Sequence, residues 1–183
     1  MTIQAVQREV RMTYLGGSFG AWVSGALWAI SAALGTWSSH TSAIIALAAG
    51  GALIFPIAQL LVRLSGHRAT LSAENTMNQL AMQVAFTIPL CLPLIGAATL
   101  HRATWFYPAF LIVVGMHYLP FTFLYGMRLY TVLAILMVVE GLAIGLYVPG
   151  ASFALGGWVG GLTLIAFGFA LRAAVAREAG RPA

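Results

Sequence analysis

The sequence predicts an all-α fold, a polytopic transmembrane bundle of six helices, and three observations support this. Of the 183 residues, 61% are hydrophobic and only 7% are charged, whereas a typical soluble domain carries about 25% charged residues. Apolar runs of about 20 residues recur along the chain, and this is the length that a helix needs to cross about 30 Å of hydrocarbon. Arginine is concentrated in alternate connections between these runs. The lipid bilayer is therefore the partner that the composition requires.

Six apolar runs give the predicted helices. The fourth and fifth runs are separated only by Gly126, Met127 and Arg128, but their joint length of about 40 residues is enough for two crossings and too long for one. The six predicted helices cover residues 15–35, 43–63, 80–100, 106–126, 128–148 and 153–173.

The polar segments outside these runs are short. Residues 1–14 and 174–183 form the predicted tails, and residues 64–79 form the longest connection. Within that connection Thr76 and Gln79 have the spacing of a capping box, which predicts the start of the third helix. The whole chain is thus a single membrane domain.

The arginines predict the orientation. With the N-terminus in the cytoplasm, Arg102 is the only arginine on the outer side. The positive-inside rule then predicts that both termini are cytoplasmic, which an even number of helices requires. Tyr125 and Tyr130 fall at the inner membrane boundary, where belts of aromatic side chains are common. The arginines predicted on the cytoplasmic side are Arg8, Arg11, Arg63, Arg68, Arg128, Arg172, Arg177 and Arg181.

Glycines spaced four residues apart mark predicted helix contacts. Gly141 and Gly145 lie in the fifth run, and Gly157 and Gly161 lie in the sixth. Small residues at this spacing let helix backbones approach closely when lipid removes the hydrophobic drive for association. They serve either packing within the chain or the interface of a homo-oligomer.

Prolines interrupt the third run. Pro89 and Pro93 each remove a backbone donor and crowd a carbonyl one turn earlier. The middle of this helix is therefore predicted to bend. Bent helices open cavities near the midplane of transporters, and they also occur as plain bends in static bundles.

His117 and Glu140 are the ionisable residues predicted deepest in the membrane. Counted from opposite membrane edges at 1.5 Å per residue, both fall near the midplane, so we expect them at one level on neighbouring helices. Ionisable residues in this position usually serve function. The pair is either a proton-binding site or a structural hydrogen bond between helices.

Other polar residues extend the list of candidates. Gln59, Gln83 and Tyr118 are candidates for ligand or proton binding, with the two glutamines either lining an inward-facing vestibule or bonding between helices. Arg63 and Arg128 are placed at the inner interface, where they are candidates for binding lipid phosphate.

Several classes of site are excluded by residue types. The chain contains no aspartate, one cysteine and four dispersed histidines, so we predict no catalytic triad, no metal site and no cofactor. The basic residues are scattered without a stripe, so we predict no binding of nucleic acid.

Four segments carry a family resemblance. They are residues 14–17 (YLGG), 80–90 (LAMQVAFTIPL), 105–110 (WFYPAF) and 117–121 (HYLPF). Together they resemble an uncharacterised bacterial family of polytopic membrane proteins. The resemblance implies a multi-pass protein of the bacterial cytoplasmic (inner) membrane and brings no established activity.

Three hypotheses of function follow. The leading one is binding or transport of a small solute, ion or lipid at a midplane cavity near the third, fourth and fifth helices. The second is a lipid-modifying membrane enzyme that uses His117 and Glu140 as acid and base. The third is a structural or regulatory subunit that acts through helix contacts.

Overall fold

The computed structural model describes residues 2–148 and 150–180, and all regular structure in these ranges is helical. Six of its helical stretches are long and apolar enough to cross a membrane, so the predicted fold class is confirmed. The elements are α1 (Ile3–Thr13), η1 (Leu15–Gly17), α2 (Ser18–Trp37), α3 (His40–Leu64), α4 (Met77–Ala85), α5 (Thr87–His101), η2 (Ala103–Trp105), α6 (Phe106–Tyr118), α7 (Phe121–Tyr125), α8 (Leu129–Leu142), η3 (Ala143–Tyr147) and α9 (Leu155–Ala179).

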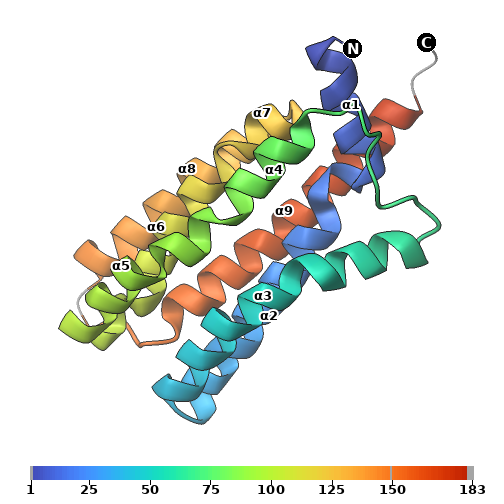
Figure 1. Cartoon of the computed structure of the whole chain (residues 1–183). Coiled ribbons are helices and arrows are strands. Elements are labelled where there is room, and N and C mark those ends of the chain that lie inside the picture. Colours follow the sequence, from blue (N-terminus) through green and yellow to red (C-terminus); the bar gives the residue numbers. More distant parts are fainter. Residues whose placement is uncertain (1, 149, 181–183) are drawn as a thin grey trace.

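The helices run the length of an elongated bundle (Figure 1). One end, which we call the terminal end, holds α1, the connection from α3 to α4, the turn before α8 and the last turns of α9. The arginines predicted to share one side of the membrane lie in these segments or, for Arg63, in the last turn of α3, except Arg181, which falls outside the described residues. That this side is the cytoplasm stays a prediction.

Glycine lets α2 and α9 pack almost backbone to backbone. A Cβ atom on Gly25 would lie 2.8 Å from the carbonyl oxygen of Gly161, and one on Gly161 would lie 3.1 Å from the carbonyl oxygen of Gly25. Further along, a Cβ on Gly157 would meet the ring of Tyr107 at 2.7 Å. The first and last spans are therefore joined along their length, although they are the most distant in the sequence.

Glycine also lets the fourth and fifth spans pack closely. A Cβ atom on Gly141 would lie 2.7 Å from the carbonyl oxygen of Pro108, and one on Gly145 would lie 3.0 Å from the ring of Trp105. The four glycines predicted at helix contacts are thus all occupied within the chain. Of the two uses predicted for these glycines, the structure shows packing within the chain.

Proline interrupts the third span, as predicted, and also the fourth. The third span breaks at Phe86 between α4 and α5, because Pro89 has no N–H for the carbonyl of Ala85 and its ring crowds that oxygen. The fourth span breaks between α6 and α7 in the same way, at Pro120.

The N-terminal segment, expected only as a tail, folds as the amphipathic helix α1. The Thr2 hydroxyl accepts a hydrogen bond from the amide of Ala5 at 3.3 Å, which caps the helix. Val6 and Val10, one turn apart, are its buried residues. The chain then turns sharply through η1, where three successive residues have positive φ, at 53°, 68° and 77°.

The predicted capping box at Thr76 is wrong. Thr76 already has helical dihedrals and makes no side-chain cap bond. The cap comes instead from the buried Asn75, whose Oδ1 accepts a hydrogen bond from the amide of Met77 at 3.0 Å. An N-cap side chain needs an extended backbone to fold back over the first turn, and Thr76 does not have one.

Candidate functional site

His117 and Glu140 have different neighbours, and no hydrogen bond between them is found among the described residues. The hydroxyls of Thr122 and Thr131 meet at 2.9 Å, and Gly141 packs beside Ile112. This antiparallel register places His117 opposite residue 136, about four residues or about 6 Å along the axis from Glu140.

Glu140 instead joins α8 to α9. Its Oε1 accepts a hydrogen bond from the hydroxyl of Thr163 at 2.6 Å, and its Oε2 is buried without a partner. No hydrogen bond from this acid to His117 is found in the described residues, so their use as an acid and base pair stays a hypothesis. Glu140 is thus a hydrogen-bonded connection between two helices.

His117 lies against α4 and α7. Its ring packs on Phe121 and Tyr118 at centroid distances of 5.1 and 5.6 Å. The backbone of Val84 on α4 lies beside the imidazole, while Nδ1 is buried and has no hydrogen-bond partner. In the tautomer whose Nε2–H points to this backbone carbonyl, the unpartnered Nδ1 is a free acceptor.

Tyr118 belongs to a buried cluster of tyrosines around η1. Tyr130 stacks between Tyr118 and Tyr125, at 5.9 and 5.1 Å between centroids. The hydroxyl of Tyr130 donates a 2.7 Å hydrogen bond to the carbonyl of Gly16. Tyr125 and Tyr130 were expected in an aromatic belt, but both are buried, and the bond from Tyr130 satisfies a carbonyl that the turn at η1 leaves without a helical donor.

The remaining candidates do not converge. Gln83, Arg63 and Arg128 are exposed on three different spans. Gln59 on α3 is half-buried, and its Oε1 is buried without a partner. No hydrogen bond found in the described residues links the two glutamines, so the vestibule stays a hypothesis.

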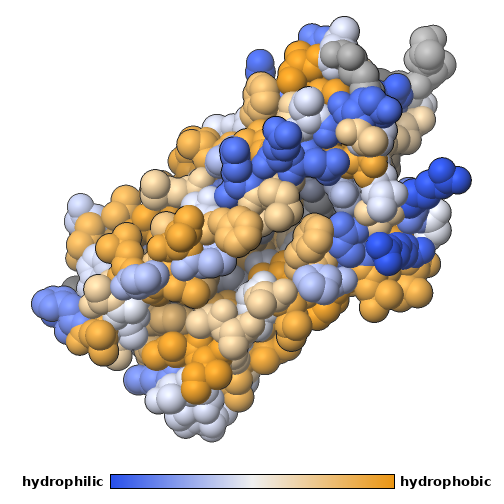
Figure 2. Space-filling view, in the orientation of Figure 1, coloured by the Kyte–Doolittle hydropathy of each residue, from blue (hydrophilic) through white to orange (hydrophobic). Residues whose placement is uncertain are grey.

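Two spans, α3 and the span formed by α4 and α5, are loosely packed, and we call them the two walls. In α3 no residue from 48 to 61 is buried, and in the third span no residue from 85 to 94 is buried. The space-filling view shows the surface hollowed between these two walls, which we call the lateral recess (Figure 2). Both walls contain proline inside a helix, at Pro56 and Pro93.

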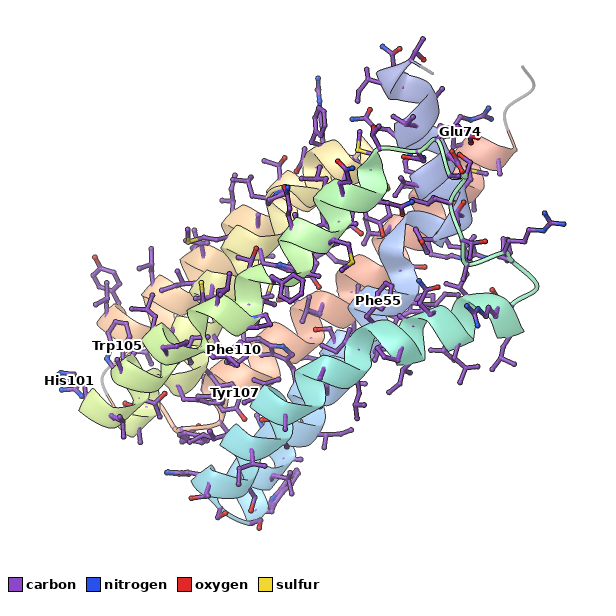
Figure 3. All side chains as sticks on the ribbon, viewed as in Figure 1. Phe55, Glu74, His101, Trp105, Tyr107 and Phe110 are labelled. Carbon is purple, nitrogen blue, oxygen red and sulfur yellow. The ribbon has the colours of Figure 1, made fainter. Side chains whose placement is uncertain are left out.

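The recess is closed at the end opposite the termini. Tyr107 and Phe110 of α6 lie there, between α5 and α3 (Figure 3). The Tyr107 hydroxyl is 2.6 Å from the hydroxyl of Ser31 on α2, and Ser31 donates to the carbonyl of Ala43 on α3 at 2.7 Å. This chain of hydrogen bonds holds three spans together.

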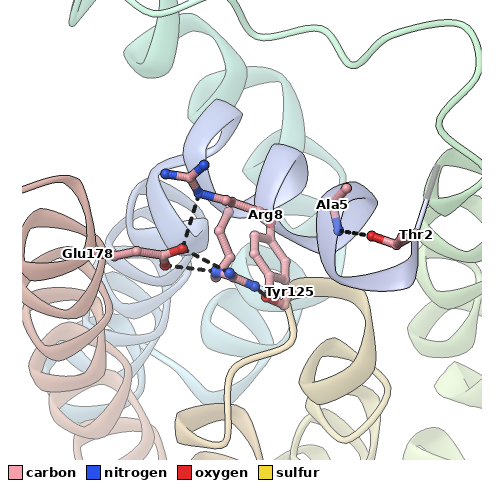
Figure 4. A network of polar contacts seen from close by, with 6 residues as sticks. Thr2, Ala5, Arg8, Tyr125 and Glu178 are labelled. Atoms are coloured by element: carbon pink, nitrogen blue, oxygen red, sulfur yellow. Dashed lines mark hydrogen bonds and ion pairs between the residues drawn. The ribbon is translucent and has the colours of Figure 1, made fainter. Parts of the chain in front are cut away.

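At the terminal end, α1 is fixed by a polar network (Figure 4). The guanidinium of Arg11 donates to both carboxylate oxygens of Glu178 on α9, at 3.0 and 2.9 Å, and to the carbonyl of Tyr125 at 2.6 Å. Arg8 lies 3.5 Å from the same carboxylate. We call the Arg11–Glu178 pair the latch.

The other side of α1 holds the connection from α3 to α4. Glu9 accepts hydrogen bonds from the amide and hydroxyl of Ser72 at 2.6 and 3.0 Å and from the side chain of Asn75 at 2.9 Å. These donors, led by the Ser72 amide, lower the pKa of Glu9 from its ordinary value of 4.5. A helix that sequence reasoning missed thus connects α7, α9 and the segment between α3 and α4.

Residues 3–174 match the model of a family described as a family of unknown function, DUF7010. The chain belongs to this family. The resemblance to a polytopic family without an assigned activity is therefore confirmed. Among curated proteins and solved structures, none matches the chain.

The DUF7010 match begins at the first residue of α1 and ends within α9. It therefore takes in α1, the latch arginine Arg11 and the lateral recess, and stops short of Glu178. Together with the six apolar spans, the match supports an integral membrane protein that crosses the bilayer several times.

Proposed function

We propose that the protein binds a small amphiphile, a lipid or lipid-like solute with a hydroxyl-bearing headgroup, in the lateral recess. The observation that carries the proposal is the buried, unpartnered Nδ1 of His117 beside the loosely packed wall formed by α4 and α5. A buried polar atom without a partner costs about 1–3 kcal/mol. A ligand that donates a hydrogen bond to this nitrogen would remove that cost.

The chemistry of the ligand follows from the groups that would receive it. Nδ1 of His117 and Oε1 of Gln59, on the α3 wall, are both hydrogen-bond acceptors. They favour a headgroup with O–H or N–H donors over a bare anion. The walls are apolar, with Phe55, Leu90 and Leu94 more than 65% exposed, which suits an alkyl chain.

Loose packing also supports movement of such a ligand. Proline in each wall frees a backbone carbonyl and weakens the local helix, so the walls can separate at lower cost than the glycine-packed spans. Release of the ligand sideways into lipid is therefore the transport route that fits this arrangement.

A monoacylglycerol is a suitable probe, because it combines two hydroxyls with one alkyl chain. Delipidated protein in detergent would be titrated with it while thermal unfolding is followed. We expect the wild type to be stabilised and His117→Phe to lose about tenfold in affinity, equivalent to one hydrogen bond of about 1.4 kcal/mol.

Gln83→Leu serves as the matched control. Gln83 lies on α4 next to the backbone that faces His117, but its own side chain is exposed and the change leaves the imidazole in place. It should bind the probe like the wild type. Equal binding of the monoacylglycerol by the wild type and His117→Phe would overturn the proposal. So would an equal rise in melting temperature on adding more of an uncharged detergent in place of the monoacylglycerol.

A further inference from the structure

A second hollow lies at the terminal end, outside the lateral recess. It is an open groove of about 380 Å³ whose walls come from α1, the turn before α8, and the last turns of α9. We call it the interfacial groove. We propose that it binds the phosphate of an anionic phospholipid, with one acyl chain lying along α8.

The charges on the walls favour an anion. Arg11 and Arg128 both line the groove, against the single carboxylate of Glu178. Glu178 is already bonded by Arg11 on two oxygens and approached by Arg8 at 3.5 Å. Arg128 is exposed and has no carboxylate within 4.0 Å among the residues that the structure describes. Its charge is available to a ligand.

The backbone adds to this field. Gly126 is left-handed, with φ at 61°, and it turns the chain so that α8 begins at Leu129 in the wall of the groove. The start of a helix carries a partial positive charge from its free amide groups. A phosphate beside Arg128 would therefore also face the positive end of α8.

An apolar ridge leads away from the groove. Val132 lines the groove and is 54% exposed, and Ile135 and Val139 continue along the same face of α8 at 59% and 53%. The spacing of three and four residues keeps these side chains on one stripe of the helix. An acyl chain attached to the bound phosphate could follow this stripe, whereas free phosphate would leave it uncovered.

The proposal is therefore specific for a lipid with net negative charge. A zwitterionic headgroup would bring an ammonium group toward Arg11 and Arg128, where it is repelled. Each basic residue near a lipid surface contributes about 1 kcal/mol toward an anionic lipid, which corresponds to about a fivefold change in affinity.

The test compares phosphatidylglycerol, phosphatidylcholine and inorganic phosphate on delipidated protein, with bound lipid counted by native mass spectrometry. We expect phosphatidylglycerol to be preferred over phosphatidylcholine, and Arg128→Gln to reduce that preference about fivefold. Arg63→Gln is the matched control, because Arg63 is exposed at the same end but does not line the groove. It should keep the full preference.

Three results would overturn the inference. The wild type could bind both lipids equally, or Arg63→Gln could lose as much as Arg128→Gln, which would show a general surface charge effect. Inorganic phosphate at millimolar concentration could displace phosphatidylglycerol, which would show a small-anion site without a role for the α8 ridge. Arg128→Gln is expected to fold, because its side chain is exposed and makes no hydrogen bond found in the described residues.

Discussion

Breaking the latch should release α1 from the bundle, and Arg11→Met is the change that tests this. Methionine keeps an unbranched apolar stem, so the substitution removes the charge and the donors with little loss of packing. It deletes three hydrogen bonds at once, two to Glu178 and one to the carbonyl of Tyr125. Glu178→Gln removes the partner charge independently.

The magnitude follows from the exposure of the pair. The Arg11 side chain is 15% exposed and that of Glu178 is 32% exposed. An exposed ion pair contributes about 0–1 kcal/mol, and breaking a fully buried one costs about 3–5 kcal/mol. Arg11→Met should therefore cost about 2–3 kcal/mol of unfolding free energy. The coupling between the two sites should be about 1–2 kcal/mol.

Arg8 provides the matched control. It approaches the same carboxylate at 3.5 Å, but its side chain is 65% exposed. Arg8→Met should cost less than about 0.5 kcal/mol.

The assay is a double-mutant cycle on unfolding in mixed micelles, combined with hydrogen exchange of the α1 amides. Arg11→Met should accelerate exchange throughout α1 and leave the spans protected. A coupling below about 0.5 kcal/mol, or equal losses in the Arg8 and Arg11 variants, would refute the latch.

Three further predictions concern other contacts. The Ser72 amide and the other loop donors lower the pKa of Glu9 in the folded state, so its contribution to stability is complete above pH 4.5 and is lost as the pH falls through the lowered pKa. Thermal unfolding between pH 7 and pH 3 should show this loss. In Glu9→Gln the melting temperature should depend less on pH over that range. Gly25→Ala should cost about 1–3 kcal/mol by overpacking, whereas Gly51→Ala, where a Cβ atom meets nothing within 4 Å, should cost nothing and gain up to about 1 kcal/mol; equal melting temperatures in detergent would contradict the close approach of α2 and α9. Thr163→Val should cost about 1–3 kcal/mol of unfolding free energy, because it leaves the carboxyl of Glu140 without its donor. Thr163→Ser keeps a hydroxyl and should retain most of the wild-type stability in the same unfolding assay.

The six spans could be predicted because hydropathy over about 20 residues depends only on the local sequence. The bends at Pro89 and Pro120 were equally local, since a proline acts on the turn before it. The signal for α1 was also present, in the Thr2 cap and the pair Val6 and Val10, but the surface that these valines cover comes from distant segments.

The polar contacts were not predictable, because each depends on the register between spans. The partner of Glu140 is Thr163, on a helix whose rotation no local pattern specifies. Tyr130 was expected to face lipid headgroups, because the sequence indicates its position along the helix but not the direction of its side chain. Its hydroxyl reaches Gly16 only because the chain turns through three left-handed residues at η1.

The close pairing of α2 with α9 also constrains biosynthesis. During translation α2 enters the membrane first of the six spans, and its partner is made last. Four other spans must therefore be inserted while the glycine-rich face of α2 is still bare. Its mean hydropathy of 1.3 is the lowest of the six spans, so the helix that waits longest for its partner is also the one that lipid retains least strongly. Completion of α9 is then the event that commits the nascent chain to its final assembly.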